Sequence, residues 1–221
     1  MSNSFNYKMV IFDVDGTILD TSSGLSASII RTIEKFEMKM LDNETINSFI
    51  GPPVQESFKK YYGLTDNEAQ KMAETFRTFY KELDLLKAVP YDNVFKMFDL
   101  LKEKKITIAI ATYKREDYAI ELMRHFHFND YTSIIYGADN YNKLKKSDII
   151  QKCIESSDID TQDILVVGDS VSDGEGANKN SCDFCGVTYG FGTKLKSDYS
   201  NVNTVKVVNS ISEIIAWIQQ N

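Results

Sequence analysis

The feature that most constrains this chain is a short apolar run that ends in two acids. Met9 to Phe12 carry only apolar side chains, which predicts a buried β-strand. Asp13 and Asp15 follow, and because side chains two apart along a strand point the same way, both carboxylates can reach one crevice. Gly16 gives the backbone the freedom to turn sharply there. Like charges this close destabilise a fold unless a cation or a shared proton compensates, so the stretch predicts a chemical site.

Further along the chain, apolar runs alternate with helical patterns. Ile106–Ala111 and Ile164–Val167 are apolar without alternation, which is typical of strands buried on both faces of a sheet. This order predicts an α/β fold with a mostly parallel, Rossmann-like three-layer core. The other expected core elements are strands over Thr132–Tyr136, Phe184–Val187 and Val205–Val208 and helices over Asp92–Lys104, Glu116–Phe126, Ser147–Glu155, from Gly174–Gly176 onward, and Ile211–Ile218.

Residues 18–86 show helical periodicity and no strand pattern. The expected helices there are Asp20–Met40, Asn43–Ile50, Val54–Tyr62 and Asp66–Leu86. Gly51-Pro52-Pro53 ends the second of them, because glycine and proline break helices. We therefore expect two domains: a core made of residues 1–17 and 87–221, and an all-helical domain inserted over 18–86.

Composition excludes several classes of protein. No apolar run approaches the roughly 20 residues that cross a bilayer, and the first residues lack a secretory signal pattern, so we expect a cytoplasmic protein that binds no membrane. The net charge of −7 argues against nucleic-acid binding but permits a small anionic substrate. Cys182 and Cys185 form a C-x-x-C pair that no second Cys or His pair completes, so we expect these cysteines in the core. We expect a monomer or a homodimer.

Polar side chains follow the expected strands, at the edge where open α/β sheets bind ligands. The residues concerned are Asp13 and Asp15 after the first strand, Thr112, Tyr113, Lys114 and Arg115 after the second, Asp169, Ser170 and Asp173 after Ile164–Val167, and Lys143, Lys145 and Lys146 ahead of a helix. Several carboxylates around one point suit Mg²⁺, and a hydroxyl with an ammonium can hold phosphoryl oxygens. The set predicts phosphoryl transfer, with one carboxylate as nucleophile and another as acid and base.

The same residues have simpler interpretations. A calcium-binding EF-hand loop fails on spacing, because Gly16 stands at loop position four rather than six. Asp169 and Asp173 could cap the following helix. Lys114 and Arg115 could contact the substrate, but we expect them at the surface, where long cationic side chains usually lie.

These residues resemble the motifs of the haloacid dehalogenase-like hydrolases, and the resemblance covers essentially the whole chain. The four motifs stand in order at Asp13–Thr17 (D-x-D-G-T), Thr112, Lys146 and Gly168–Asp173 (G-D-x-x-x-D). Lys143 and Lys145 compete with Lys146 for the third place. The resemblance implies that Asp13 is the nucleophile and Asp15 the general acid and base. It implies a Mg²⁺ cofactor held by Asp13, by the backbone carbonyl of Asp15 and by Asp169, with Asp173 either ligating the ion or orienting its waters.

The resemblance further implies that Thr112 and Lys146 bind the transferring phosphoryl group. Phe49–Pro53 and Gly190–Thr193 are similar to segments of the phosphoglycolate phosphatase-like branch. Tyr113 departs from the family pattern, because relatives often have asparagine at that position.

The implied activity is Mg²⁺-dependent hydrolysis of a small phosphorylated metabolite, with phosphoglycolate or a nucleoside monophosphate as leading substrates. The helical insertion resembles the mobile cap of the family, which closes over the site. A phosphomutase acting on a sugar phosphate, and a non-catalytic protein that binds a phosphorylated ligand, are the alternatives.

Overall fold

The computed structural model describes residues 4–139 and 143–220, which divide into two compact units. The first unit comprises the described residues up to Asp20 and from Pro90 onward, and the second is Thr21–Val89. Each boundary lies three residues beyond the place where the sequence pattern puts it. Ile18 and Leu19 explain the first shift, because both are fully buried in the first unit.

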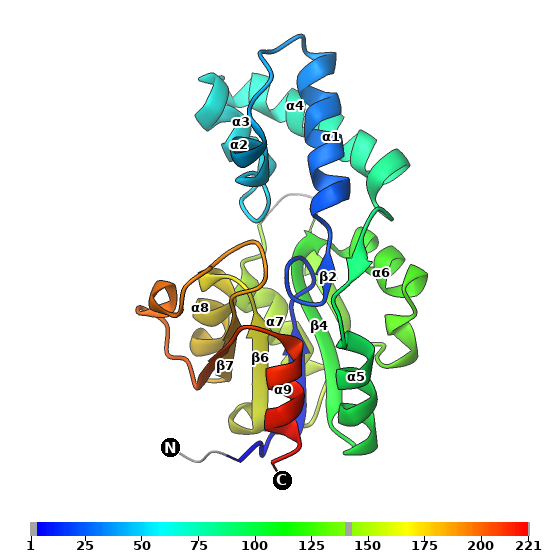
Figure 1. The fold of residues 1–221 in the computed structure, drawn as a ribbon, viewed down its shortest axis with the longest axis vertical. Coiled ribbons are helices and arrows are strands. Elements are labelled where there is room, and N and C mark those ends of the chain that lie inside the picture. The colour runs from blue at the N-terminus through cyan, green and yellow to red at the C-terminus, as the bar shows by residue number, and fades with distance from the viewer. Residues whose placement is uncertain (1–3, 140–142, 221) are drawn as a thin grey trace. The chain divides into compact units, whose positions relative to one another are not determined.

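The first unit is built on a six-stranded sheet in the order β5-β4-β1-β6-β7-β8 (Figure 1). Its strands are β1 (Met9–Phe12), β4 (Thr107–Arg115), β5 (Ile135–Ala138), β6 (Ile164–Gly168), β7 (Asp183–Val187) and β8 (Lys206–Val208). All neighbouring strands pair in parallel, as the sequence predicts. β1 lies between β4 and β6, so its carboxyl end is flanked by two further strand ends.

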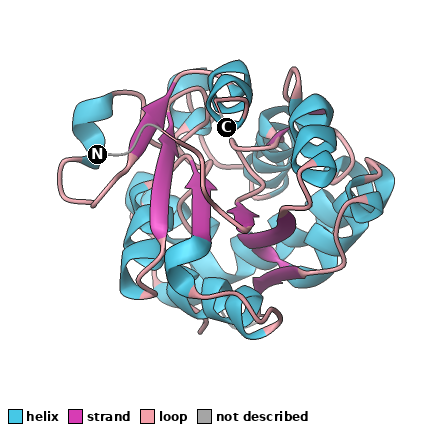
Figure 2. Ribbon diagram, turned by 90° about the horizontal axis from the view of Figure 1, so that it is seen from below, coloured by secondary structure: helices cyan, strands magenta, loops and turns pink. Residues whose placement is uncertain are grey.

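Helices cover both faces of this sheet (Figures 1 and 2). They are α5 (Val94–Glu103), α6 (Glu116–His125), α7 (Lys146–Glu155), α8 (Val171–Lys179) and α9 (Ile211–Ile218), with short 3₁₀ turns at Phe128–Asp130, Thr161–Asp163 and Lys196–Tyr199. Met9 and Ile11 pack in one core cluster with α7, while the Phe12 ring lies 5.0 Å from that of Phe98 on α5. β1 is apolar throughout because both of its faces are buried.

Three core elements differ from the sequence prediction. β5 runs over Ile135–Ala138, whereas the predicted strand begins at Thr132 and ends at Tyr136. β4 extends to Arg115 instead of ending at Ala111, and its pairing with β5 shifts register between these residues. Thr112 therefore lies inside the strand rather than after it. The prediction that a helix opens at Gly174–Gly176 is wrong, because α8 already begins at Val171, where Ser170 caps it.

The second unit contains α1 (Ser22–Lys35), α2 (Asn43–Asn47), α3 (Val54–Tyr62), α4 (Asp66–Phe79) and a π-helical turn (Tyr80–Asp84). Asp84 ends that turn and is fully buried. Ser28 Oγ donates to its carboxylate at 2.8 Å, and Lys87 Nζ lies 2.7 Å from it. A buried carboxylate needs such partners, so this cluster holds α1 against the π-helical turn. The single helix predicted over Asp66–Leu86 is thus two elements.

β2 (Leu19–Asp20) and β3 (Val89–Pro90) form a separate two-stranded sheet. The prediction that residues 18–86 contain no strand is therefore wrong, since β2 falls within them. A strand of two residues has no periodicity for a sequence pattern to detect.

Cys182 and Cys185 are free and buried, which confirms the expected core position of the C-x-x-C pair, and Cys153 is free and buried as well. In the parts of the chain that the structure describes, no helix combines the length and apolar character needed to cross a membrane.

Candidate active site

The central strand delivers the first site residue. β1 ends at Phe12, and the backbone N–H of Asp13 still donates to Val167 O at 3.0 Å, which keeps Asp13 in register with β6. Asp13 is 7% exposed, although charged side chains are rarely buried without compensation. Its position at the carboxyl end of a central parallel strand is where open α/β sheets bind ligands.

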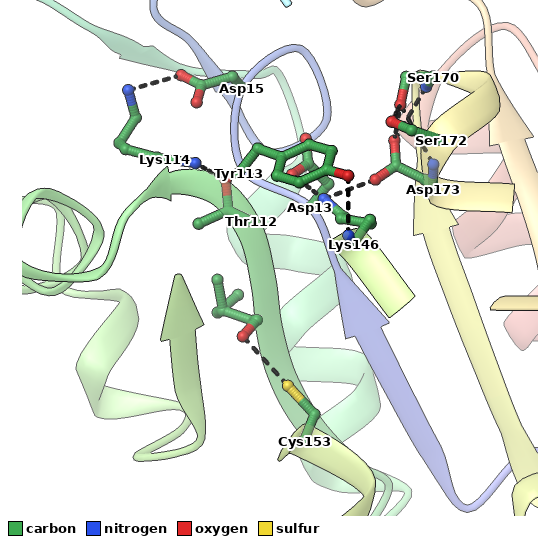
Figure 3. A network of polar contacts seen from close by, with 11 residues as sticks. Asp13, Asp15, Thr112, Tyr113, Lys114, Lys146, Cys153, Ser170, Ser172 and Asp173 are labelled. Atoms are coloured by element: carbon green, nitrogen blue, oxygen red, sulfur yellow. Dashed lines mark hydrogen bonds and ion pairs between the residues drawn. The ribbon is translucent and has the colours of Figure 1, made fainter. Parts of the chain in front are cut away.

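Three buried acids converge at this point. Asp169 directly follows β6 and Asp173 lies in the first turn of α8. Together with Asp13, they each offer a carboxylate oxygen, and these oxygens all lie within 4.8 Å of one another. Lys146, the first residue of α7, places its Nζ 2.6 Å from Asp13 Oδ1 and 2.6 Å from Asp173 Oδ1 (Figure 3).

This cluster contains more acidic than basic groups, and the pKa values of its members are shifted. Burial raises the pKa of Asp13 overall; attraction to Lys146 opposes this effect, and repulsion from Asp173 and Asp169 adds to it. Burial and Asp173 also raise the pKa of Asp169, to about 6. Burial lowers the pKa of Lys146, but Asp13 and Asp173 raise it overall, so the side chain remains an ammonium. Three carboxylates against one ammonium leave a deficit of positive charge, and their oxygens are the ligands that Mg²⁺ prefers.

The two carboxylate oxygens of Asp173 have different partners. Oδ1 faces Lys146, while Oδ2 accepts hydrogen bonds from Ser170 N at 3.0 Å and Ser170 Oγ at 2.6 Å (Figure 3). The second set forms a capping box at the start of α8. The helix-capping interpretation is therefore correct for Asp173, and it is compatible with a place in the acidic cluster.

Asp169 is held by a loop that the sequence analysis connected only with a family branch. Phe191 N and Gly192 N donate to Asp169 Oδ2 at 2.6 and 2.8 Å. Thr193 binds the backbone of the same aspartate, since its N and Oγ1 donate to the Asp169 carbonyl at 2.8 and 2.6 Å. Two main-chain donors fix the carboxylate without adding a charge, which leaves its other oxygen to the cluster.

Two glycines make room for the Gly190–Thr193 loop, which we call the brace because it holds Asp169 in place. A Cβ on Gly190 would lie 2.2 Å from Gly16 O and 2.4 Å from Asp169 Oδ2. A Cβ on Gly16 would lie 2.2 Å from Asp169 Oδ2, and the φ of +81° at Gly16 independently favours glycine. The turn after β1 and the Gly190–Thr193 loop therefore pack backbone to backbone around Asp169.

Replacing Gly190 with alanine is expected to displace Asp169. We expect kcat/KM to fall about 100-fold, a loss that a misplacement of about 1 Å can cause. Gly24→Ala is the matched control: its Cβ would lie 2.3 Å from Asp84 O, so it too is overpacked against backbone, but on α1 of the helical unit, outside the acidic cluster. Steady-state kinetics and thermal melts of both variants separate the two effects. Equal losses of activity would argue against the brace.

Asp15 lies apart from the three clustered acids. Its Oδ1 is 3.1 Å from Lys114 Nζ, and Figure 3 shows the pair directed away from Asp13. Lys114 is only 9% exposed, so the prediction that it lies at the surface is wrong. A lysine can be buried where a carboxylate pairs with it, and local sequence does not reveal a partner 99 residues away. Arg115 is partly exposed and pairs with Asp117 at 2.6 Å.

The remaining predicted residues fall into two groups. Thr112 is buried on β4, and its Oγ1 accepts a hydrogen bond from Lys114 N at 3.1 Å. Lys143 and Lys145 are exposed, whereas Lys146 reaches the acidic cluster. Among these three lysines, Lys146 is thus the one whose ammonium touches Asp13.

Comparison with known proteins agrees with this geometry. A 5'-nucleotidase from Pseudomonas aeruginosa is 27% identical over 192 residues, which cover 86% of this chain and 87% of that protein. A phosphoglycolate phosphatase from Neisseria gonorrhoeae is 28% identical and covers 95% of this chain and 92% of its own length. The crystal structure of a predicted phosphatase from Clostridium acetobutylicum superposes with a TM-score of 0.87 at 30% identity, covering 97% of this chain and 99% of that one.

The family model of the haloacid dehalogenase-like hydrolases matches residues 10–187, which include all four motifs recognised in the sequence. The chain therefore belongs to the haloacid dehalogenase-like hydrolases, and within them to the phosphoglycolate phosphatase-like branch of phosphoric monoester hydrolases.

Proposed function

We propose that this protein is a Mg²⁺-dependent phosphatase that hydrolyses a small phosphate monoester through an aspartyl-phosphate on Asp13. The observation that carries the proposal is the buried group of Asp13, Asp169 and Asp173, with carboxylate oxygens within 4.8 Å of one another and Lys146 Nζ 2.6 Å from Asp13. A structural core gains nothing from such a concentration of acids, whereas phosphoryl transfer depends on charge neutralisation and positioning.

In the first step, a carboxylate oxygen of Asp13 attacks phosphorus. The bond between phosphorus and the ester oxygen breaks, and Asp15 donates a proton to that leaving oxygen. Thr112 Oγ and Lys146 Nζ would donate hydrogen bonds to the phosphoryl oxygens, whose charge must be balanced in the transition state. Lys114, 3.1 Å from Asp15, holds the acid that supplies the proton.

In the second step, Asp15 takes a proton from water, and the water oxygen attacks phosphorus of the aspartyl-phosphate. The bond from phosphorus to Asp13 breaks, inorganic phosphate leaves, and both carboxyl groups return to their starting states. Asp13, Asp169 and Asp173 would hold Mg²⁺, together with the backbone carbonyl of Asp15. Bound there, Mg²⁺ would neutralise the acids and let an anionic phosphate ester approach them.

Phosphoglycolate and nucleoside monophosphates are the leading substrates, and a phosphoglycolate phosphatase and a 5'-nucleotidase among the relatives support that choice. We propose that the helical unit, Thr21–Val89, acts as the cap that encloses the substrate. The cytoplasmic location and the monomeric or homodimeric state remain predictions.

The test is phosphate release from a panel of monoesters. The panel contains phosphoglycolate, nucleoside monophosphates, sugar phosphates and 4-nitrophenyl phosphate, each with Mg²⁺ or with a chelator. We expect release with Mg²⁺, a loss of at least about 100-fold with the chelator, and recovery on adding Mg²⁺ back. Full activity in the chelator would refute the metal requirement.

Two other outcomes identify the alternatives. Isomerised sugar phosphate with little free phosphate would indicate a phosphomutase. Binding of phosphate esters with no turnover of any of them would indicate a non-catalytic binding protein.

A further inference from the structure

The lysine at the centre of the site is held by a residue that departs from the family pattern. Lys146 is the first residue of α7, and the residue before it, Lys145, makes no side-chain cap. The backbone N–H of Lys146 instead donates to the hydroxyl oxygen of Tyr113, at 2.8 Å, from the end of β4 (Figure 3). The first N–H groups of a helix lack partners within the helix, so the Tyr113 hydroxyl caps the Lys146 N–H, next to the Asp148 carboxylate that accepts from Lys145 N at 2.9 Å.

Tyr113 contacts both the backbone and the ammonium group of Lys146. Its hydroxyl binds the lysine backbone, and the lysine Nζ lies 5.6 Å from the centre of the tyrosine ring. Tyr113 is 45% exposed, whereas the Lys146 side chain is only 3% exposed. The tyrosine thus lies on the solvent side of the ammonium and limits where the ammonium can move.

The lysine stem is also confined from a second direction. On α8, a Cβ at Gly176 would lie 3.2 Å from Lys146 Cγ, so the backbone of that helix lies close to the stem. With the backbone fixed by the Tyr113 hydroxyl and the stem flanked by α8, Lys146 Nζ is directed to Asp13 and Asp173. Pre-set positions of this kind are what phosphoryl transfer requires of its cationic groups.

We propose that Tyr113 is a positioning residue for Lys146, which ties the start of α7 to β4 and shields the ammonium that holds the phosphoryl group. The proposal rests on the proposed phosphatase function. It also accounts for the departure from asparagine: an asparagine side chain is several ångströms shorter than tyrosine and cannot reach across the same gap.

The same helix offers a matched control at its other end. The Tyr136 hydroxyl lies 2.8 Å from the Oγ of Ser156, the residue that caps the carboxyl end of α7, and Lys152 Nζ lies 5.7 Å from the Tyr136 ring. Tyr136→Phe therefore removes a hydrogen bond of the same length, from the same helix and beside another lysine, but away from the acids.

The experiment compares Tyr113→Phe, Tyr113→Asn and Tyr136→Phe by kcat and KM on 4-nitrophenyl phosphate with saturating Mg²⁺, and by inhibition with inorganic phosphate. For Tyr113→Phe we expect kcat to fall about fivefold, the equivalent of one neutral hydrogen bond, with KM changed less than about twofold. Phosphate inhibition should weaken in proportion. Tyr113→Asn should fall at least as far, and Tyr136→Phe should keep the wild-type kcat.

Two results would overturn the proposal. One is a Tyr113→Phe enzyme with wild-type kcat and phosphate inhibition. The other is an equal loss of kcat in Tyr136→Phe, which would assign the effect to general loosening of α7.

Amide hydrogen exchange at Lys146 separates failure of the proposal from failure of the proposed function. Faster exchange at the Lys146 amide is expected in Tyr113→Phe and not in Tyr136→Phe, whether or not the wild-type protein releases phosphate. Unchanged exchange would contradict the proposed role of the Tyr113 hydroxyl in holding the Lys146 backbone. Faster exchange in a protein without phosphatase activity would support that role and refute the proposed phosphatase function.

Discussion

Asp13→Asn is expected to abolish phosphate release and leave the fold intact. The amide has almost the size of the carboxylate but cannot attack phosphorus, so the aspartyl-phosphate does not form. We expect kcat to fall by about four orders of magnitude or more, as for other enzymes that lose their nucleophile. Single-turnover and steady-state assays on 4-nitrophenyl phosphate measure this loss. Asp130→Asn, the same change at an exposed acid, should retain wild-type activity.

The same substitution is expected to stabilise the protein when Mg²⁺ is absent. Burial and neighbouring acids raise the pKa of Asp13, which means that its charge is held at a cost in the folded state. Removing that charge relieves repulsion with Asp169 and Asp173, so the Tm in a chelator should rise. Enzymes commonly give up stability for a charged site in this way. A lower Tm in the chelator would show that the pairing of Asp13 with Lys146 outweighs the repulsion.

Lys146→Met is expected to have the largest effect on stability. Its Nζ lies 2.6 Å from both Asp13 and Asp173, and its loss leaves buried acids without their ammonium. Removing one partner of a buried ion pair typically costs about 3–5 kcal/mol. We expect that loss in chelator by denaturant unfolding, with part of it recovered in Mg²⁺, because a bound cation supplies some of the missing charge. Activity should be lost in both conditions.

Lys145→Met provides the control for this result. Lys145 precedes Lys146 directly but is exposed, so the substitution removes one lysine charge at nearly the same place in the sequence. Its stability and kcat should stay close to those of the wild type, since exposed charges contribute little. Similar losses in both variants would attribute the effect to net charge rather than to the buried pairing.

The core of the fold could be predicted because burial leaves a clear trace in the sequence. Met9–Phe12 and Ile164–Val167 are apolar at every position, and strands of this kind occur only in sheets covered on both faces. The π-helical turn Tyr80–Asp84 could not be predicted, because its residues continue the helical pattern of α4. What sets it apart is the burial of Asp84 among Ser28, Arg31 and Lys87, which lies in tertiary contacts.

Part of the candidate site could likewise be predicted from the sequence, and part could not. The places of Asp13, Asp169 and Asp173 followed from strand ends, since parallel strands bring their carboxyl ends to one edge. The donors that orient Asp169 are main-chain N–H groups of Phe191 and Gly192, which every residue except proline has. No side-chain pattern can identify such donors.

The brace around Asp169 also sets the order in which a nascent chain can complete its site. Asp13 and Gly16 follow β1, whereas Gly190–Thr193 follows β7, so all three clustered acids are synthesised before the brace. Domains generally fold as units, so the sheet and the brace are expected to form together once Gly190–Thr193 has been made. Before that point, the carboxylate of Asp169 lacks the two donors that orient it. The proposed Mg²⁺ site would therefore be complete only once this loop has been made.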